Sequence, residues 1–271
     1  MNKTKIEWCD STWNPVTGCQ YGCEYCYARK QAKRFKGYDR VISDRAAIAS
    51  FGLERGLNML YQPLCRKTKK GETVKAPYPF GFEPTFHRYR LDEPQCIEKP
   101  QNIFVCSMAD LFGEWIPDEW IKAVFEACKK APQHRYIFLT KNYRRYNELR
   151  KKEILPLDKN MYLGVSVATE RQLKQAALFW NNIDFLSMEP LSDYMSFDEW
   201  SVDINLKPHY KWVIIGAETG NRKDRVTVKK EWVDDIVYVC KQLSTPVFMK
   251  DSLKGIWGKP LIRQYPWEVG E

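Results

Sequence analysis

The 271-residue sequence has only three histidines, no long apolar run and no low-complexity segment. No stretch approaches the ~20 apolar residues of a membrane-spanning helix, and the first residues lack the apolar core of a secretion signal. We therefore expect a soluble, cytoplasmic protein with no membrane partner. The scarcity of histidine disfavours zinc sites of mixed Cys and His ligands, because His87, His134 and His209 are far apart in the sequence.

Hydrophobic residues make up 44% of the chain and aromatic residues 14%, which is enough to build a core and excludes wholesale disorder. The nine cysteines are an odd number, and a chain of this length needs no disulfides to be stable. Free thiols or a metal site are therefore favoured over a disulfide framework.

The net charge of +9 is concentrated in one segment. Between Arg29 and Lys75 there are 13 basic and 4 acidic residues, so the rest of the chain is balanced. Aromatic side chains are interleaved with these charges. Basic groups neutralise phosphates and aromatic rings stack on bases, so a nucleic-acid surface is one hypothesis, and a solvated insertion is the other. The candidate contact residues for nucleic acid are Arg29, Lys33, Arg34 and His87.

After residue 100, short apolar runs alternate with amphipathic segments, which is typical of βα units and a mostly parallel sheet. The expected strands are Ile103–Ser107, Tyr136–Thr140, Tyr162–Val167, Ile183–Met188, Trp212–Gly216 and Pro246–Lys250, with an earlier one near Trp13–Thr17. This pattern predicts an α/β fold, a full or partial (β/α) TIM-type barrel, with a doubly wound open sheet as the alternative.

Residues 37–100 depart from this regular spacing, with helical segments expected near Ala46–Leu60. We predict an insertion or lid over residues 37–100, after the first helix, within a single domain that spans residues 1–271.

Cys19, Cys23 and Cys26 form a CxxxCxxC motif between a predicted strand and a predicted helix. Three thiolates on one loop can bind three irons of a [4Fe-4S] cluster, which leaves the fourth iron without a protein ligand. S-adenosylmethionine (SAM) needs such an open iron, since its amino and carboxylate groups chelate it. A zinc site and three unrelated buried cysteines are the alternatives.

With Tyr25 just before its last cysteine, this motif resembles the radical SAM signature. The wider sequence resembles a phage- and prophage-associated three-cysteine-motif family in that superfamily, distantly similar to spore photoproduct lyase. The segments that carry the resemblance are TKIEWCDSTWNPVTGC, FHRYRLDEP, VCSMADLF, APQHRYIFLTKN, YLGVSV, LSMEPL and WVIIGAETG. GAETG and VFMKDSL depart from the GGESG-like and FFKQWG-like strings expected of the family.

The resemblance implies a partial (β/α) barrel with a [4Fe-4S] cluster and SAM at one end. It implies reductive cleavage of SAM to a 5′-deoxyadenosyl radical, with an electron donor such as flavodoxin or ferredoxin. Ser107 and Asp110 would then meet the methionine amino group, and Ser166 the ribose or carboxylate. Tyr25 and the strand ends at Glu189 and Glu218 would line the adenine.

The barrel also predicts that polar side chains gather at the carboxyl ends of the parallel strands. Such residues follow six expected strands: Ser107, Asp110, Lys141, Ser166, Glu189, Glu218 and Lys250. Lys141 and Lys250 are candidate catalytic residues. Any one of the seven side chains could instead be a solvated loop residue or a helix cap.

The remaining cysteines show no second motif. Cys128 and Cys240 lie on apolar helix stripes and are expected in the core. Cys106 is next to a strand end, where it is either a candidate catalytic hydrogen-atom donor or a core residue. His87 either faces the site or is a structural, hydrogen-bonding histidine.

The sequence thus favours a radical SAM enzyme that acts on a nucleic-acid base or nucleotide, in repair or modification of DNA or RNA. A radical SAM enzyme with a small-molecule or peptide substrate is the second hypothesis. A nucleic-acid-binding protein whose three cysteines hold a structural metal is the third. The reaction subclass and the oligomeric state stay open.

Overall fold

The computed structural model describes residues 1–42, 51–54, 56–156, 158–196 and 210–268. The chain divides into two compact units. The first comprises Met1–Phe138 with Pro156–Met161, and the second comprises Leu139–Leu155 with Tyr162–Glu271.

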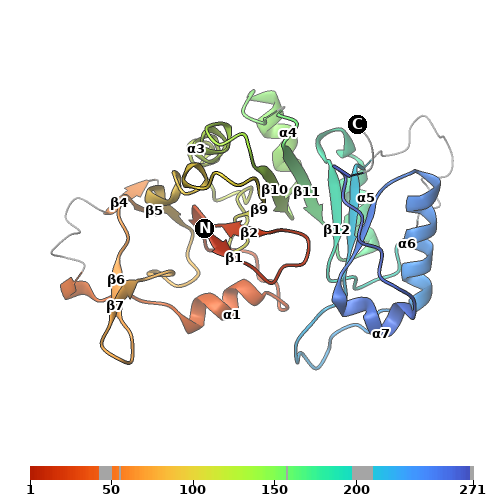
Figure 1. The fold of residues 1–271 in the computed structure, drawn as a ribbon, viewed down its shortest axis with the longest axis horizontal. Helices are drawn as coiled ribbons and strands as arrows, with labels where there is room; N and C mark the ends of the chain where they lie inside the picture. Colours follow the sequence, from red (N-terminus) through yellow and green to blue (C-terminus); the bar gives the residue numbers. More distant parts are fainter. Residues whose placement is uncertain (43–50, 55, 157, 197–209, 269–271) are drawn as a thin grey trace. The chain divides into compact units, whose positions relative to one another are not determined.

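The main sheet of the first unit contains both neighbouring and distant segments of the chain. Its order is β1 (Asn2–Lys3), β2 (Ser11–Trp13), β9 (Asn102–Val105) and β10 (Arg135–Thr140), and β10 extends two residues beyond this unit. The β2–β9 and β9–β10 pairs are parallel, whereas β1 runs antiparallel to β2. Helix α3 (Asp118–Lys129) connects β9 to β10, as a βα unit requires (Figure 1).

The predicted apolar stripe of α3 is confirmed, because Ile121, Val124, Phe125 and Cys128 are all buried. Phe125 lies with its ring centroid 6.2 Å from that of Phe112 and 5.3 Å from that of Phe138. This aromatic cluster fixes the helix on the sheet, since ring pairs at such distances add to the free energy of burial.

A second sheet of the first unit has the order β3 (Val16–Thr17), β8 (Thr85–His87), β5 (Leu57–Leu60) and β4 (Phe51–Glu54). The remaining elements of this unit are the hairpin of β6 (Cys65–Lys67) and β7 (Thr73–Lys75), helix α1 (Tyr27–Arg34) and the 3-10 turns η1 (Arg88–Arg90) and η2 (Pro94–Cys96).

The helical segments predicted near Ala46–Leu60 are wrong where the structure describes them, because β4 and β5 form an antiparallel hairpin there. Residues 46–50 lie outside the described residues. The physical reason is tertiary: β5 also pairs in parallel with β8, which buries Leu60. A strand partner more than twenty residues away outweighs local helix propensity.

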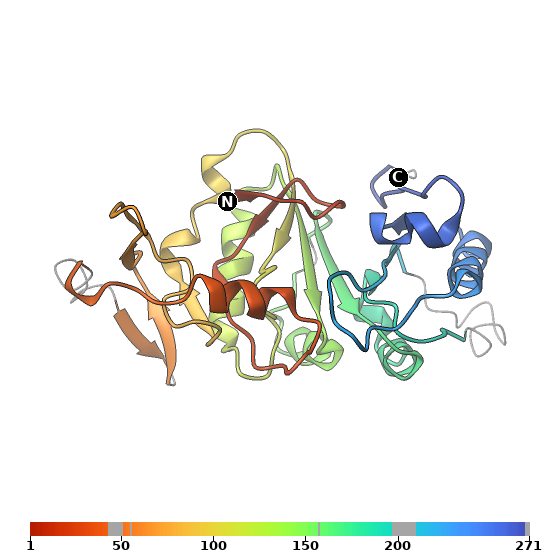
Figure 2. The ribbon, with the colours of Figure 1, turned by 90° about the horizontal axis from the view of Figure 1, so that it is seen from below.

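The second unit is a parallel sheet of β11 (Met161–Ser166), β12 (Phe185–Met188), β13 (Trp212–Ile215) and β14 (Val247–Met249), in that order. The helical elements of this unit are α4 (Tyr143–Lys151), α5 (Glu170–Ala177), η3 (Trp180–Asn182), α6 (Lys230–Gln242), η5 (Asp251–Leu253) and α7 (Lys254–Trp257). Helix α7 packs beside α6 (Figures 1 and 2). The spacing of Leu173, Ala176, Ala177 and Trp180 predicts one apolar helix stripe, but α5 ends at Ala177 and Trp180 belongs to η3.

The C-terminal segment is attached to this sheet through Trp212. The indole nitrogen of Trp212 donates to the carbonyl of Gln264 at 2.9 Å, and its ring lies 5.8 Å from Tyr265 and 5.7 Å from Trp267. A fully buried Trp needs such an acceptor for its N–H group.

Six of the predicted strands and the βα alternation are thus confirmed, and the protein is α/β with parallel-rich sheets. No strand pairing that would close a barrel is found among the described residues. The barrel, the single domain over 1–271 and the insertion over 37–100 stay predictions. In the part of the chain that is described, no helix has the length and apolar character to span a bilayer.

Gly164 of β11 offers a test of this packing, because a Cβ atom there would lie 2.1 Å from the ring of buried Phe185. We expect Gly164→Ala to lower the free energy of unfolding by about 1–3 kcal/mol, the usual cost of overpacking a core. Gly255→Ala is the control, since a Cβ atom there meets no atom within 4 Å. Its effect should stay under about 1 kcal/mol. Urea unfolding measures both, and equal stability of the two variants would contradict the packing of β11 on β12.

Candidate functional site

The three-cysteine loop, residues 19–26, joins β3 to α1 in the first unit. It is anchored at Gly18, whose N–H donates to the carbonyl of Met108 at 2.9 Å. Gly18 has a φ of +88°, and a Cβ atom on it would lie 2.2 Å from the carbonyl oxygen of Glu83. Only glycine fits this close passage. It brings the start of the cysteine loop alongside the segment that follows β9.

All three cysteines of the loop are free and half-buried. Cys26 is the N-cap of α1, and its Sγ accepts the N–H of Arg29 at 3.3 Å. The pKa of Cys19 is raised to about 12, mainly by burial, with smaller contributions from the neighbouring Cys23 and Cys26. The thiols are therefore close enough to interact electrostatically. No three His, Cys, Asp or Glu side chains converge on a metal-sized site in the described ranges, so the cluster stays a prediction.

Arg29 holds the loop from inside the first unit. Its Nη2 donates to the carbonyl of Cys19 at 3.3 Å and also to that of Tyr21. Its guanidinium carbon lies 4.9 Å from the ring centroid of Phe82. The side chain predicted to contact nucleic acid is thus engaged in ordering the cysteine loop. Lys33 and Arg34, by contrast, are exposed at the end of α1.

The segment after β9 contains Ser107 and Asp110, two of the predicted SAM-binding residues. Ser107 Oγ donates to Asn14 Oδ1 at 3.2 Å, and the Met108 N–H donates to the same oxygen at 2.9 Å. Asp110 is 6% exposed and its Oδ1 accepts the N–H of Phe112 at 3.0 Å.

Asp110 is also close to the cysteine loop, as its electrostatic effect shows. Its carboxylate adds to the elevation of the pKa values of Cys19 and Tyr21, for which burial is the main cause. The structure therefore brings together the predicted metal-ligand loop and a predicted cofactor-binding carboxylate. Tyr25 lies in the same loop and is half-buried.

Two residues at this site were missed by the sequence reasoning. Asn14 connects the end of β2 to Ser107, and the Tyr27 hydroxyl donates to the carbonyl of Ser107 at 2.8 Å. An amide directly after a buried strand and before Pro15 was the available signal for Asn14, because such a residue commonly hydrogen-bonds local backbone. Tyr27 carried no comparable signal.

Cys106 is buried beside this segment, with a φ of +57°. Burial raises the pKa of its thiol to about 12. Its environment supports the core-packing alternative more than a hydrogen-atom donor at an open site.

His87 is fully buried on β8, with both ring nitrogens engaged. Nε2 lies 2.8 Å from Thr17 Oγ1, and Nδ1 lies 3.3 Å from the Tyr89 hydroxyl. Burial holds the pKa of His87 well below its usual value, and the nearby positive charge of Arg90 lowers it further. These contacts support the structural alternative for His87.

In the second unit, polar side chains at the strand ends occur as pairs. Lys141 Nζ donates to Ser166 Oγ at 3.0 Å, which joins the ends of β10 and β11. Lys250 Nζ lies 2.5 Å from Glu189 Oε1, which joins the ends of β14 and β12. Polar side chains that follow different strands thus contact each other in two pairs, while their roles toward SAM and in catalysis stay predictions.

Glu218 pairs with a residue of its own loop and not with a side chain from another strand end. It forms a two-pronged ion pair with Arg222 in its own loop, at 2.8 and 2.7 Å. Such bidentate pairs are strong and orient both groups. Arg222 was not among the predicted site residues, although its spacing of four from Glu218 was visible.

The buried His87 predicts how the stability of the fold depends on pH. Below pH ~6.5 the unfolded chain binds a proton at this residue that the folded chain refuses, so stability should fall as the pH falls. A His87→Gln variant, which cannot titrate there, should show a flatter profile. The difference between the two chains should grow by ~1.4 kcal/mol per pH unit between pH 6.5 and 5. Urea unfolding at several pH values measures it, and parallel profiles would contradict a neutral, buried His87.

Comparison with known proteins gives one positive result. No curated protein and no solved structure matches the chain. One family model, described as "Protein of unknown function (DUF5131)", matches residues 3–264. This match covers the cysteine loop and the polar strand ends of both units. The chain therefore belongs to the DUF5131 family.

Proposed function

We propose that this protein is a radical SAM iron–sulfur enzyme, in which Cys19, Cys23 and Cys26 would hold a [4Fe-4S] cluster and the open iron of that cluster would bind SAM. The observation that carries the proposal is the position of the three thiols on a single loop, beside Asp110. We also propose that the βα units form the partial (β/α) barrel of that superfamily.

The donor set fits such a cluster, because three soft thiolates are what iron–sulfur centres use. Cys19 is mostly protonated in the metal-free chain, since burial raises its pKa to about 12. Binding of the cluster would have to displace this proton, as it does for other thiolate ligands. The chemistry that the cluster supplies when bound is one-electron reductive cleavage of SAM to methionine and a 5′-deoxyadenosyl radical. A flavodoxin or ferredoxin is the proposed electron donor.

The chain's own residues would bind and orient. Gly18 and Arg29 hold the loop backbone, which fixes the spacing of the three thiols. Asp110 and Ser107 offer a carboxylate and a hydroxyl to the SAM amino group. In the second unit we propose that Ser166 and Glu189 contact SAM while Lys141 and Lys250, each held by one of them, take part in catalysis.

The proposed substrate is a nucleic-acid base or nucleotide. The support is the charge excess of the Arg29–Lys75 segment and the exposure of Lys33 and Arg34 on α1, the helix that directly follows the cysteine loop. Arg29 adds less to this surface than its sequence position suggests, because it is directed to the loop carbonyls.

Anaerobic reconstitution with iron and sulfide tests the cluster. We expect a brown protein with about four irons per chain, which forms 5′-deoxyadenosine from SAM on reduction. Cys19→Ala, Cys23→Ala and Cys26→Ala should each lose iron and activity. Cys96→Ala is the matched control, because Cys96 is exposed and lies outside the loop. A colourless protein with bound zinc would instead indicate a structural metal.

Deuterium transfer tests the substrate class. Deuterated oligonucleotides should pass deuterium into 5′-deoxyadenosine, and their affinity should fall steeply with salt. Lys33→Gln should reduce the slope of log affinity against log salt by about 0.7, as expected for one phosphate contact on a single strand. Lys174→Gln, which removes an exposed lysine paired with Glu170, should leave it unchanged. Transfer from a peptide or small molecule, with none from nucleic acid, would contradict this substrate.

A further inference from the structure

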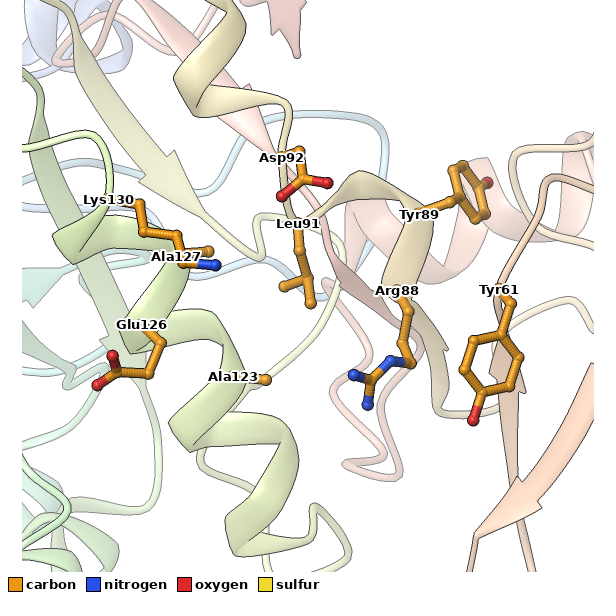
Figure 3. Close-up of a pocket in the computed structure, with 9 residues that line it drawn as sticks. All are labelled: Tyr61, Arg88, Tyr89, Leu91, Asp92, Ala123, Glu126, Ala127 and Lys130. Atoms are coloured by element: carbon orange, nitrogen blue, oxygen red, sulfur yellow. The ribbon is translucent and has the colours of Figure 1, made fainter.

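A cavity of about 460 Å³ lies in the first unit, and none of the predicted site residues lines it. The lining comes from the end of β5, the turn η1 and one face of α3 (Figure 3). The residues are Tyr61, Arg88, Tyr89, Leu91, Asp92, Ala123, Glu126, Ala127 and Lys130. Its volume falls in the range of about 300–1,000 Å³ that small-molecule sites occupy.

Arg88 and Tyr61 form the most distinctive part of this cavity. The guanidinium carbon of Arg88 lies 5.6 Å from the ring centroid of Tyr61 and 5.7 Å from that of Phe86. Phe86 is fully buried, whereas the side chain of Tyr61 is 47% exposed. In Figure 3 the guanidinium lies between Tyr61 and Ala123. The exposed ring of Tyr61 can stack on a planar ligand, and the guanidinium of Arg88 beside it can bind an anion.

Two cations of the cavity have no acidic partner among the described residues. Neither Arg88 nor Lys130 forms an ion pair or a side-chain hydrogen bond with any described residue. Glu126 is paired with Lys129 at 2.9 Å, and its carboxylate is directed away from Arg88 in Figure 3. Asp92 accepts a hydrogen bond from Gln95 Nε2 at 3.3 Å. The two acids therefore leave Arg88 and Lys130 available to an anionic ligand.

The face of α3 in the cavity carries two alanines beside two charged residues. Ala123 and Ala127 are one turn apart and present only methyl groups, between the charged residues of the same helix. A sugar or base edge can approach the two methyl groups closely, since they project little from the helix.

From these contacts we propose that the cavity binds one nucleotide unit of a single-stranded nucleic acid. The base stacks on Tyr61, the phosphate is bound by Arg88 and Lys130, and Asp92 accepts a hydroxyl or amino hydrogen. Tyr61 belongs to the basic Arg29–Lys75 segment, which can bind the nucleic acid on either side of this nucleotide. The site rests on the proposed function only for the nucleic-acid class, because it requires neither the cluster nor SAM.

Binding of a short fluorescent deoxyoligonucleotide to the metal-free, full-length chain tests the site. Tyr61→Ala should weaken binding about fivefold to a hundredfold, as expected for loss of one stacked base. Arg88→Ala should also weaken binding, because it removes a group that binds the phosphate. Tyr61→Phe should retain affinity, since it keeps the ring. Lys130→Gln should lower the salt slope by about 0.7. Lys129→Gln is its matched control, as the neighbouring lysine is already paired with Glu126.

Two further measurements make the result decisive. A 5′-mononucleotide should compete with the oligonucleotide if a single unit is recognised, whereas inorganic phosphate alone should compete poorly without a base to stack. Unchanged thermal midpoints confirm that the exposed substitutions leave the fold intact. Equal affinity of wild type, Tyr61→Ala and Arg88→Ala, or no binding by the wild type, would overturn the site. SAM cleavage by the reconstituted enzyme would remain in either case, so failure of the site is distinguishable from failure of the proposed chemistry.

Discussion

The parallel pairing of β2 with β9 is the contact on which the candidate site of the first unit depends. It places Ser11 opposite Ile103, so two distant stretches of chain end at the same edge of a sheet. Asn14 then leaves β2 where Ser107 leaves β9, and the hydrogen bond between them follows directly. After β3, the next strand along the chain, the Gly18 N–H donates to the carbonyl of Met108 and makes a second contact between the same two stretches. Without this pairing the cysteine loop and Asp110 would have no reason to be neighbours.

Parallel strands explain the second unit by the same rule. Their carboxyl ends lie together, so side chains that follow different strands become partners. Lys141 meets Ser166 and Lys250 meets Glu189 for this reason. Each of the two lysines is held by a neighbouring side chain and is not simply a solvated surface charge.

The basic residues of this protein have at least three different kinds of environment. Arg29 is used within the first unit, where it donates hydrogen bonds to two backbone carbonyls of the cysteine loop and lies over the ring of Phe82. Lys33 and Arg34 stay on the exposed end of α1. Arg88 lies outside the segment that carries the net charge, yet it is one of the cations that have no described acid partner. Net charge counted along a sequence therefore locates a binding surface only approximately, since burial and local pairing decide which charges a ligand can reach.

The sequence by itself determined the α/β class, six strands, the apolar stripe of α3 and the cysteine loop, because these depend on local periodicity and spacing. The polar strand ends were also predictable, since a parallel sheet places them by rule. Only the tertiary structure decided that residues 51–54 and 57–60 are strands, that Arg29 serves the loop, and that Glu218 pairs with Arg222. It alone assembled Tyr61, Arg88 and α3 into one cavity. These features depend on partners that are distant in the sequence, or on which of several nearby residues becomes the partner. A short stretch of sequence does not contain the information to predict them.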